Sequence, residues 1–402
     1  MTTFRAKRVR ALRIAIASGV ASALVLPLGV TLAWNQLLDS RASTAIVTSA
    51  VAIPDTPAAL VAGLGEGGQL SHLFVATLDA SGVGGTVVLL PIGAATEVEV
   101  PAADDATAAS TVAVPKRLAE VYATDGLGGL ANEVQGLLDV SFVAVGALGR
   151  VELINVLAPL GGVDVLLDRD VVTVAVDGTP TKLASAGESS YPIDRLVDIV
   201  LARRPNEKES ERFARHREVW NGIVKRVGAG VDLPPEVDTT TAGLADASNF
   251  MQRVLGGALQ VWQLSAAPVL DKTANPKRQD MYALDRAEVV MVFASVAPSA
   301  MSGGDYPLTV MIDSAFNDPL VSRAAVAALL DAGIGVGVMR EVSAQEQANT
   351  VIEADDEVAN ALQALLAGAL GPIEKGAWGS PVAGIDAAIT LGADFVASVR
   401  NK

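Results

Sequence analysis

The sequence predicts an α/β fold, an α+β sandwich whose mixed central sheet is flanked by helices. A small C-terminal α/β domain is expected to follow, and one transmembrane helix to precede it. Half of the 402 residues are apolar and only 19% are charged, which is typical of a packed protein. Short β-branched apolar runs alternate with runs at helical spacing, a pattern that favours strands packed against helices.

The N-terminal segment predicts a membrane anchor. Five basic residues in 1–13 precede the charge-free run 14–34, which has about the 20-residue length that a bilayer crossing needs. The basic tail places the N-terminus in the cytoplasm and the bulk of the chain outside the membrane. The competing interpretation is a cleaved signal peptide, whose apolar region is shorter, roughly 7–15 residues.

Charge and composition exclude several functions. The formal net charge is −15, although the first 38 residues carry five basic side chains and no acid. An acidic surface of this kind repels nucleic acid, so no nucleic-acid partner is expected. With two histidines and no cysteine, neither a disulfide nor a His/Cys metal cluster can form.

The first elements are predicted in chain order. Residues 35–68 are rich in Gly, Pro and small side chains and are predicted to be a stalk or linker. Within the domain 69–298, the β-branched runs and a Gly-rich turn predict a hairpin. The predicted strands are 72–79, 86–92, 140–148 and 161–168, and the predicted helices are 127–139, 149–160, 192–204, 207–227 and 244–261. Segment 285–297 fits a helix or a strand.

The glycines and proline at 301–307 indicate a boundary, and a second domain is predicted over 299–402. Its pattern alternates strand and helix, which predicts a small α/β unit whose last segment, 384–396, ends in a strand. Its other predicted elements are strands 308–312 and 334–340 and helices 320–333 and 356–370.

Several motifs together resemble the LytR–CpsA–Psr (LCP) family. The run Leu153-Ile154-Asn155 precedes Gly161-Gly162-Val163-Asp164-Val165, and an Arg-rich segment follows at 201–220. The last hundred residues resemble the LytR C-terminal domain, with Gly392, Asp394 and Phe395 in its terminal motif. The resemblance covers most of residues 70–400.

The resemblance implies a cell-envelope protein that handles polyprenyl-pyrophosphate-linked wall glycopolymers. In this family arginines hold the pyrophosphate, an apolar groove holds the lipid, and carboxylates with Mg²⁺ assist transfer to peptidoglycan. Residue by residue, it points to five candidates for binding the phosphate or lipid headgroup: Arg117, Arg203, Arg212, Arg215 and His216. The last three lie three and four apart, on one helical face.

Other family positions have changed. Where the family has a metal-binding aspartate, this chain has Gln69-Leu70-Ser71-His72, and where it has an arginine followed by an aspartate, the chain has Ile92 and Gly93. A charged phosphate stabiliser is commonly worth about 10³-fold in rate. The resemblance therefore implies a degenerate site with no identified metal ligand and unknown catalytic residues.

The leading hypothesis is a pseudoenzyme that binds or scaffolds polyprenyl-linked glycopolymer together with cell-envelope proteins. One alternative is an active phosphotransferase with a rearranged site, the only case in which Mg²⁺ is expected. Another is a purely structural envelope protein, in which the basic cluster is a solvated helix face paired with glutamates. A nucleophilic role for Ser71 beside His72 is a further, weaker alternative, since no third orienting group follows from the sequence.

Overall fold

The computed structural model describes residues 51–96, 114–174, 179–204, 207–302, 306–342, 347–379 and 381–401. The predicted cytoplasmic tail 1–13 and transmembrane helix 14–34 lie outside these residues, as does the first part of the predicted linker. None of the helices in the described ranges combines the length and apolar character that a bilayer crossing requires. Residues Ala52–Lys402 form one compact unit.

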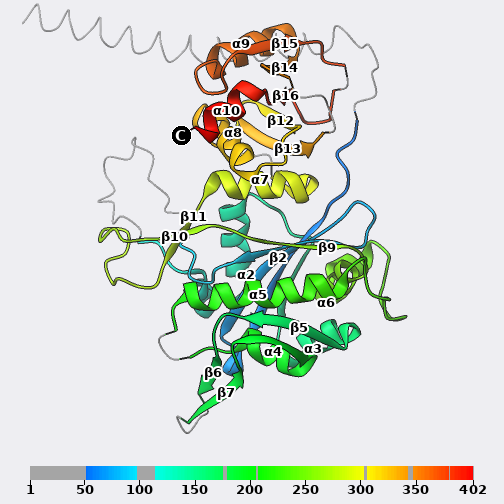
Figure 1. Cartoon of the computed structure of the whole chain (residues 1–402), viewed down its shortest axis with the longest axis vertical. Coiled ribbons are helices and arrows are strands. Elements are labelled where there is room, and N and C mark those ends of the chain that lie inside the picture. Colours follow the sequence, from blue (N-terminus) through cyan, green and yellow to red (C-terminus); the bar gives the residue numbers. More distant parts are fainter. Residues whose placement is uncertain are drawn as a thin grey trace, which may run out of the picture. The chain divides into compact units, whose positions relative to one another are not determined.

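A mixed five-stranded sheet lies at the centre of the first half of this unit (Figure 1), with the strand order β4-β1-β2-β3-β9. Strands β1, β2 and β3 are antiparallel neighbours, while β4 pairs parallel to β1 and β9 pairs parallel to β3. The strands are β1 (Ala58–Leu64), β2 (Leu70–Leu78), β3 (Gly85–Leu90), β4 (Ala144–Leu148) and β9 (Leu259–Gln263).

Helices cover both faces of this sheet, because β1, β2 and β3 are apolar and buried on both sides. One face packs against α2 and α7, and the other against α3, α4, α5 and α6. These helices are α2 (Leu118–Leu138), α3 (Arg150–Leu157), α4 (Ile193–Leu201), α5 (Glu209–Val227), α6 (Ala247–Leu255) and α7 (Arg286–Val296). The result is a three-layer α/β/α arrangement.

Three short strand pairs lie beside the main sheet. They pair β5 with β8, β6 with β7, and β10 with β11, each in antiparallel fashion. Their bounds are β5 (Gly162–Leu167), β6 (Val171–Val174), β7 (Pro180–Ala184), β8 (Gly187–Pro192), β10 (Ala266–Pro268) and β11 (Tyr282–Leu284). Helix α5 packs directly on β5, where Gly222 allows the close approach.

A second mixed sheet forms in the C-terminal part, with the order β13-β12-β16-β14-β15. Only β14 and β16 run antiparallel; the other neighbours are parallel. The strands are β12 (Thr309–Ser314), β13 (Gly335–Glu341), β14 (Thr350–Ala354), β15 (Ile373–Gly376) and β16 (Ala387–Thr390), with helices α8 (Pro319–Asp331), α9 (Asp356–Leu366) and α10 (Ala393–Arg400). Helix α7 contacts α8 and β13 as well as α2.

The predicted fold class is confirmed in its α/β character and its mixed central sheet, and three element predictions are corrected. The predicted linker 35–68 contains β1, which pairs with a strand on each side and is covered by helices on both faces of the sheet. The predicted helix 244–261 ends at Leu255, and the following residues pair with β3 as β9. The chain closes with helix α10 rather than with a strand.

Segment 285–297, which the sequence left open, is helix α7. Its N-cap Asp285 accepts a hydrogen bond from the Glu288 amide, an arrangement that satisfies one of the free N–H groups of a first helical turn.

Candidate functional site

A pocket of about 330 Å³ lies beside the N-terminal end of α5. We call it the α5 pocket. Three segments that are far apart in the sequence form its walls: the residues after β3, the start of α2, and the segment between α4 and α5, with one aspartate from the residues before β11. Its lining residues are Ile92, Gly93, Arg117, Ala119, Arg203, Glu207, Lys208, Glu209 and Asp280.

Two of the predicted phosphate-binding arginines line this pocket. Arg117 donates from Nη2 to Glu120 Oε1 over 2.9 Å. Arg203 makes no hydrogen bond or ion pair within the described residues. Partial burial lowers the pKa of Arg203, and the like charge of Arg212 lowers that pKa further. Because a guanidinium stays charged at neutral pH, Arg203 gives the pocket a cation that no carboxylate pairs with directly.

The pocket's two glutamates are engaged by other arginines. Glu209 accepts from Arg212 Nη2 and, over 3.0 Å, from the backbone N–H of Ile92. Glu207 Oε1 accepts from Arg215 Nη1 over 2.5 Å. Burial raises the pKa of Glu209, whereas the adjacent guanidinium opposes that shift. The glutamates therefore act as internal counterions of the helix arginines.

Asp280 caps helix α5. Its Oδ2 accepts the N–H of Glu209 over 2.6 Å, and its Oδ1 accepts the Tyr282 hydroxyl over 2.9 Å. A carboxylate is stabilised at this position, because the first-turn N–H groups of a helix present partial positive charge. No local pattern in the sequence indicates this residue, which lies 71 positions away from the amide that it caps.

The end of strand β3 contributes no charge to the pocket. Ile92, at the position where the LCP resemblance expects an arginine, is 2% exposed. At Gly93, a Cβ atom would come within 2.9 Å of the Asp280 carbonyl oxygen, so a larger side chain there would need movement of the backbone. This part of the lining is apolar and tight, and it supplies no cation.

Neither Arg212 nor Arg215 lines the α5 pocket, and Arg215 instead lines a neighbouring pocket. Arg212 is 2% exposed and Arg215 is 8% exposed. Arg215 also donates from Nη2 to the Ala202 carbonyl over 2.6 Å. The Nε atoms of both residues, and that of Arg117, are buried without a hydrogen-bond partner in the described part of the chain. Unsatisfied buried donors are uncommon in folded proteins, and three of them belong to predicted phosphate-binding arginines.

The remaining candidate, His216, lies outside the α5 pocket in a buried chain of hydrogen bonds. Trp220 Nε1 donates to His72 Nε2 over 2.9 Å. An indole N–H can only donate, so the His72 proton is on Nδ1 and points at His216 Nδ1, 3.0 Å away. His216 then donates from Nε2 to the Val200 carbonyl over 3.0 Å.

Both imidazoles are neutral. Burial, with added repulsion from Arg212 and Arg215, lowers the pKa of His72 to about 3. Burial and neighbouring positive charge likewise lower the pKa of His216 well below its usual range. All four ring nitrogens are used within the protein. The Ser71 hydroxyl is buried without a hydrogen-bond partner, so the geometry gives no support to a Ser71–His72 nucleophile.

The donor set of the α5 pocket does not suit Mg²⁺. Such an ion needs several oxygen ligands in octahedral geometry, and the carboxylates here accept hydrogen bonds from guanidinium and amide groups instead. Among the residues that the structure describes, no group of three acidic or histidine side chains is arranged to hold a metal ion.

A neighbouring pocket of about 430 Å³ shares Glu207 and Lys208 with the α5 pocket. There Glu218 shares a hydrogen bond with Asp168. Burial, that hydrogen bond and the charge of Asp168 together raise the pKa of Glu218 to about 7. Glu218 is therefore only partly ionised near neutral pH.

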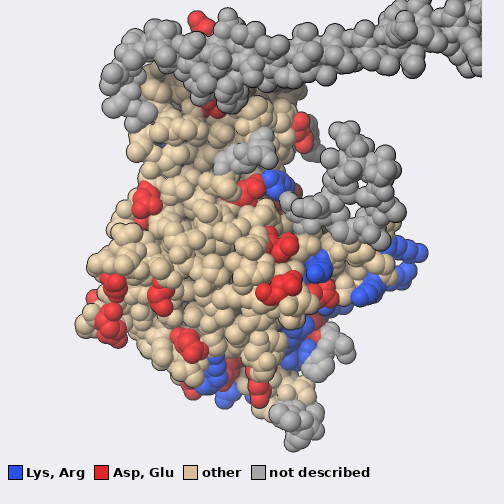
Figure 2. Space-filling view, turned by 180° about the vertical axis from the view of Figure 1, so that it is seen from behind, with Lys and Arg blue, Asp and Glu red and all other residues tan. Residues whose placement is uncertain are grey.

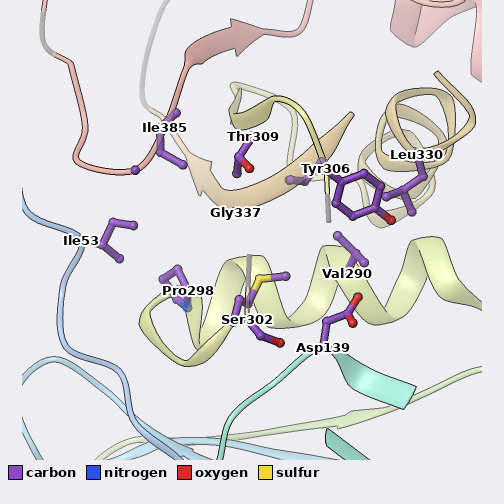
Figure 3. Close-up of a pocket in the computed structure, with 14 residues that line it drawn as sticks. Ile53, Asp139, Val290, Pro298, Ser302, Tyr306, Thr309, Leu330, Gly337 and Ile385 are labelled. Carbon is purple, nitrogen blue, oxygen red and sulfur yellow. The ribbon is translucent and has the colours of Figure 1, made fainter. Parts of the chain in front are cut away.

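A third, smaller cavity of about 140 Å³ lies between α7 and β13 (Figure 3). Apolar side chains such as Val290 and Leu330 make up much of its wall, and Asp139 lies at its edge. The described lining of this cavity contains no Lys or Arg, so it offers no cation for a phosphate. The α5 pocket is therefore the better anion site.

Comparison with solved structures returns proteins of the family that the motifs resemble. B. subtilis TagV has a TM-score of 0.41 at 13% identity and covers 59% of this chain and 94% of its own. B. subtilis TagT has a TM-score of 0.39 at 15% identity, with 59% and 88% covered. The LytR-CPS2A-psr family protein YwtF (TagT), with bound octaprenyl pyrophosphate lipid, has a TM-score of 0.37 at 15% identity, with 58% and 86% covered.

At these scores and identities the likeness concerns the fold alone. No protein-family model matches the chain, and no curated protein matches it. A function for this chain has to be argued from its own residues.

The structure thus brings together Arg117 and Arg203 in one pocket, buries Arg212 against the pocket residue Glu209, and places Arg215 in the neighbouring pocket and His216 elsewhere. It adds Glu209 and Asp280. The first of these was visible in the sequence only as a local partner of the arginines.

Proposed function

We propose that this chain is a membrane-anchored cell-envelope protein that binds the phosphate of a polyprenyl-linked glycopolymer in the α5 pocket and does not transfer it. The proposal rests on the environment of Arg203. Its guanidinium lines the pocket without a direct partner in the described chain, beside Arg117 and close to the charge of Arg212.

Phosphate would give Arg203 a direct partner. Burial lowers the pKa of Arg203, as do the like charges of Arg212 and Arg117, whereas Glu209 and Glu207 raise it without touching the guanidinium. A phosphate oxygen accepting from Arg203 and Arg117 would form charge-assisted hydrogen bonds, which arginine geometry favours. Each such bond contributes about 1.5–3 kcal/mol, or roughly a 10- to 150-fold change in affinity.

Loss of catalysis is proposed from the residues that follow β3. Transfer of a phosphoryl group depends on charge placed around it from several sides. Here the β3 side offers Ile92 and Gly93, and the carboxylates Glu209 and Asp280 are already bound by Arg212 and by the α5 amide. The site can therefore hold an anion through its arginines and lacks the further charged groups that transfer would need.

Residues 14–34 supply the proposed membrane anchor, with the basic tail in the cytoplasm and Ala52–Lys402 outside. In this setting the pocket would meet a lipid-linked phosphate at the bilayer surface. The C-terminal sheet, which resembles the LytR C-terminal domain, is the proposed contact region for other envelope proteins.

The test is a binding titration with the full chain in detergent micelles. Geranylgeranyl pyrophosphate serves as the probe, and geranylgeraniol and inorganic pyrophosphate separate the lipid from the phosphate contribution. We expect Arg203→Ala to weaken binding of the pyrophosphate lipid by roughly 10- to 150-fold. Arg195→Ala, which removes an exposed arginine of α4, is the matched control and should leave the affinity unchanged.

Two results would count against the proposal. Equal affinities of wild type, Arg203→Ala and Arg195→Ala would show that the α5 pocket does not bind the phosphate. Steady phosphate release from the lipid in the presence of Mg²⁺, abolished in Arg203→Ala, would show an active phosphotransferase with a rearranged site.

A further inference from the structure

The loop that joins β10 to β11, residues 269–281, combines an exposed leucine with exposed basic side chains. Leu270 is 84% exposed, the highest value among the large apolar side chains of the described chain that lie at the surface. Lys272, Lys277 and Arg278 are also exposed, and none of the three forms an ion pair within the described residues. Figure 1 shows this loop extending away from the central sheet.

The charge of the loop contrasts with that of the protein. The formal net charge of the whole chain is −15. In Figure 2, acidic side chains are spread over the face in view, while Lys and Arg lie mainly along one edge. The exposed acid of the loop, Asp271, accepts the backbone N–H of Thr273 over 2.6 Å. Residues 270–278 therefore carry a net charge of about +2 at neutral pH.

The loop is held in one shape by a buried asparagine. Asn275 is 4% exposed. Its Nδ2 donates to the carbonyls of Val269 and Gln279 over 3.1 and 2.8 Å, and its Oδ1 accepts the Gln279 N–H over 2.8 Å. Arg278 takes a left-handed backbone conformation, with φ of 50°, which is uncommon for a residue with a side chain. These contacts fix the direction in which Leu270 and the basic residues point.

We propose that this loop docks on an anionic lipid bilayer, with Leu270 inserted among the lipid headgroups and Lys272, Lys277 and Arg278 against lipid phosphates. An exposed apolar side chain beside basic residues suits a membrane interface, where one end meets acyl chains and the other meets negative charge. Asp280, at the end of the same loop, lines the α5 pocket, so docking would hold that pocket near the membrane surface. The inference goes beyond the proposed phosphate binding and does not depend on it.

The experiment uses the full chain reconstituted into vesicles. Because the chain has no cysteine, Leu270→Cys gives a single site for an environment-sensitive fluorophore. Leu320→Cys is the matched control, since Leu320 is 70% exposed on α8. In vesicles of phosphatidylcholine with 30 mol% phosphatidylglycerol, roughly the anionic fraction that attracts basic segments, we expect the label at 270 to be quenched by spin-labelled lipid and the label at 320 not to be.

A second set of measurements tests the contribution of the basic residues. Each basic residue near an anionic surface contributes roughly fivefold to partitioning, so a net charge of +2 gives about 25-fold. The quenching at 270 should fall in pure phosphatidylcholine, in high salt, and in the variant Lys272→Glu/Lys277→Glu/Arg278→Glu. Equal quenching at 270 and 320 in anionic vesicles would overturn the proposal, as would quenching at 270 that survives the triple variant unchanged. Titration of pyrophosphate lipid in detergent should be unaffected by that variant, which separates this result from the pocket.

Discussion

Acidification should destabilise this protein through His72. The ring is fully buried and neutral, and burial lowers its pKa to about 3, with Arg212 and Arg215 lowering it further. In the unfolded chain the pKa returns to about 6.5. Between these two values the unfolded state binds a proton that the folded state does not, so the free energy of unfolding falls as the pH falls through this window.

The size of the effect follows from the two pKa values of His72. At pH 7.5 the unfolded imidazole is almost neutral and contributes nothing. At pH 5.0 its protonation favours the unfolded state by about 2 kcal/mol, since each pH unit below 6.5 contributes about 1.4 kcal/mol. The pKa of His216 is also lowered in the folded state, so this residue adds to the loss of stability.

Urea denaturation of the full chain, followed by tryptophan fluorescence at pH 7.5 and 5.0, measures this loss. His72 and His216 are the two histidines of the sequence, so the variant His72→Gln/His216→Gln contains no imidazole. Glutamine can still accept the Trp220 N–H. Glu218, whose folded pKa is raised to about 7, acts in the opposite direction as the pH falls, but it is present in both proteins.

The difference between the two proteins therefore isolates the histidines. Wild type should lose at least about 2 kcal/mol more than the double variant between pH 7.5 and 5.0. The same loss in both proteins would refute the assignment of His72 as a buried neutral group.

Two substitutions test the packing around α5 by thermal denaturation. Glu209→Gln leaves Arg212 buried without a carboxylate and should cost about 3–5 kcal/mol; a change below 1 kcal/mol, roughly the value of a surface pair, would show that this ion pair is solvated. Gly222→Ala brings a Cβ within 2.6 Å of the Asp164 carbonyl oxygen and should cost about 1–3 kcal/mol. Gly136→Ala, with no atom within 4 Å of the new Cβ, is its control, and equal stability of the two variants would contradict the tight contact of α5 with β5.

Local patterns in the sequence were enough for the long helices. Helix α5 carries apolar side chains at helical spacing, and the loop before α8 supplies an aspartate cap and a first-turn proline. Strand β1 was missed for a physical reason. Its Ala and Gly residues have low strand propensity and the segment before it contains prolines, so it resembles a linker. Its burial comes from tertiary contacts, with strands on either side and helices over both faces.

The candidate site was predictable only in part, because its components are joined by tertiary contacts. The arginine spacing in 201–220 identified the basic side of the pocket. Nothing local indicated that Asp280 would cap α5 or that His72 would meet His216 across 144 positions. The sequence showed which positively charged groups exist, and the folded structure determined which of them are neutralised.

That distinction decides how many arginines remain for a ligand. Arg212 and Arg215 are almost fully buried, and a buried guanidinium without a counterion would be strongly destabilising. Glu209 and Glu207 supply those counterions and thereby remove most of the charge of both pairs from the pocket. Arg203 and Arg117 lie at the pocket surface, where Arg117 is shared with Glu120. Among the arginines, phosphate binding here would therefore depend first on Arg203, so in the titration with pyrophosphate lipid the affinity should fall more for Arg203→Ala than for Arg117→Ala.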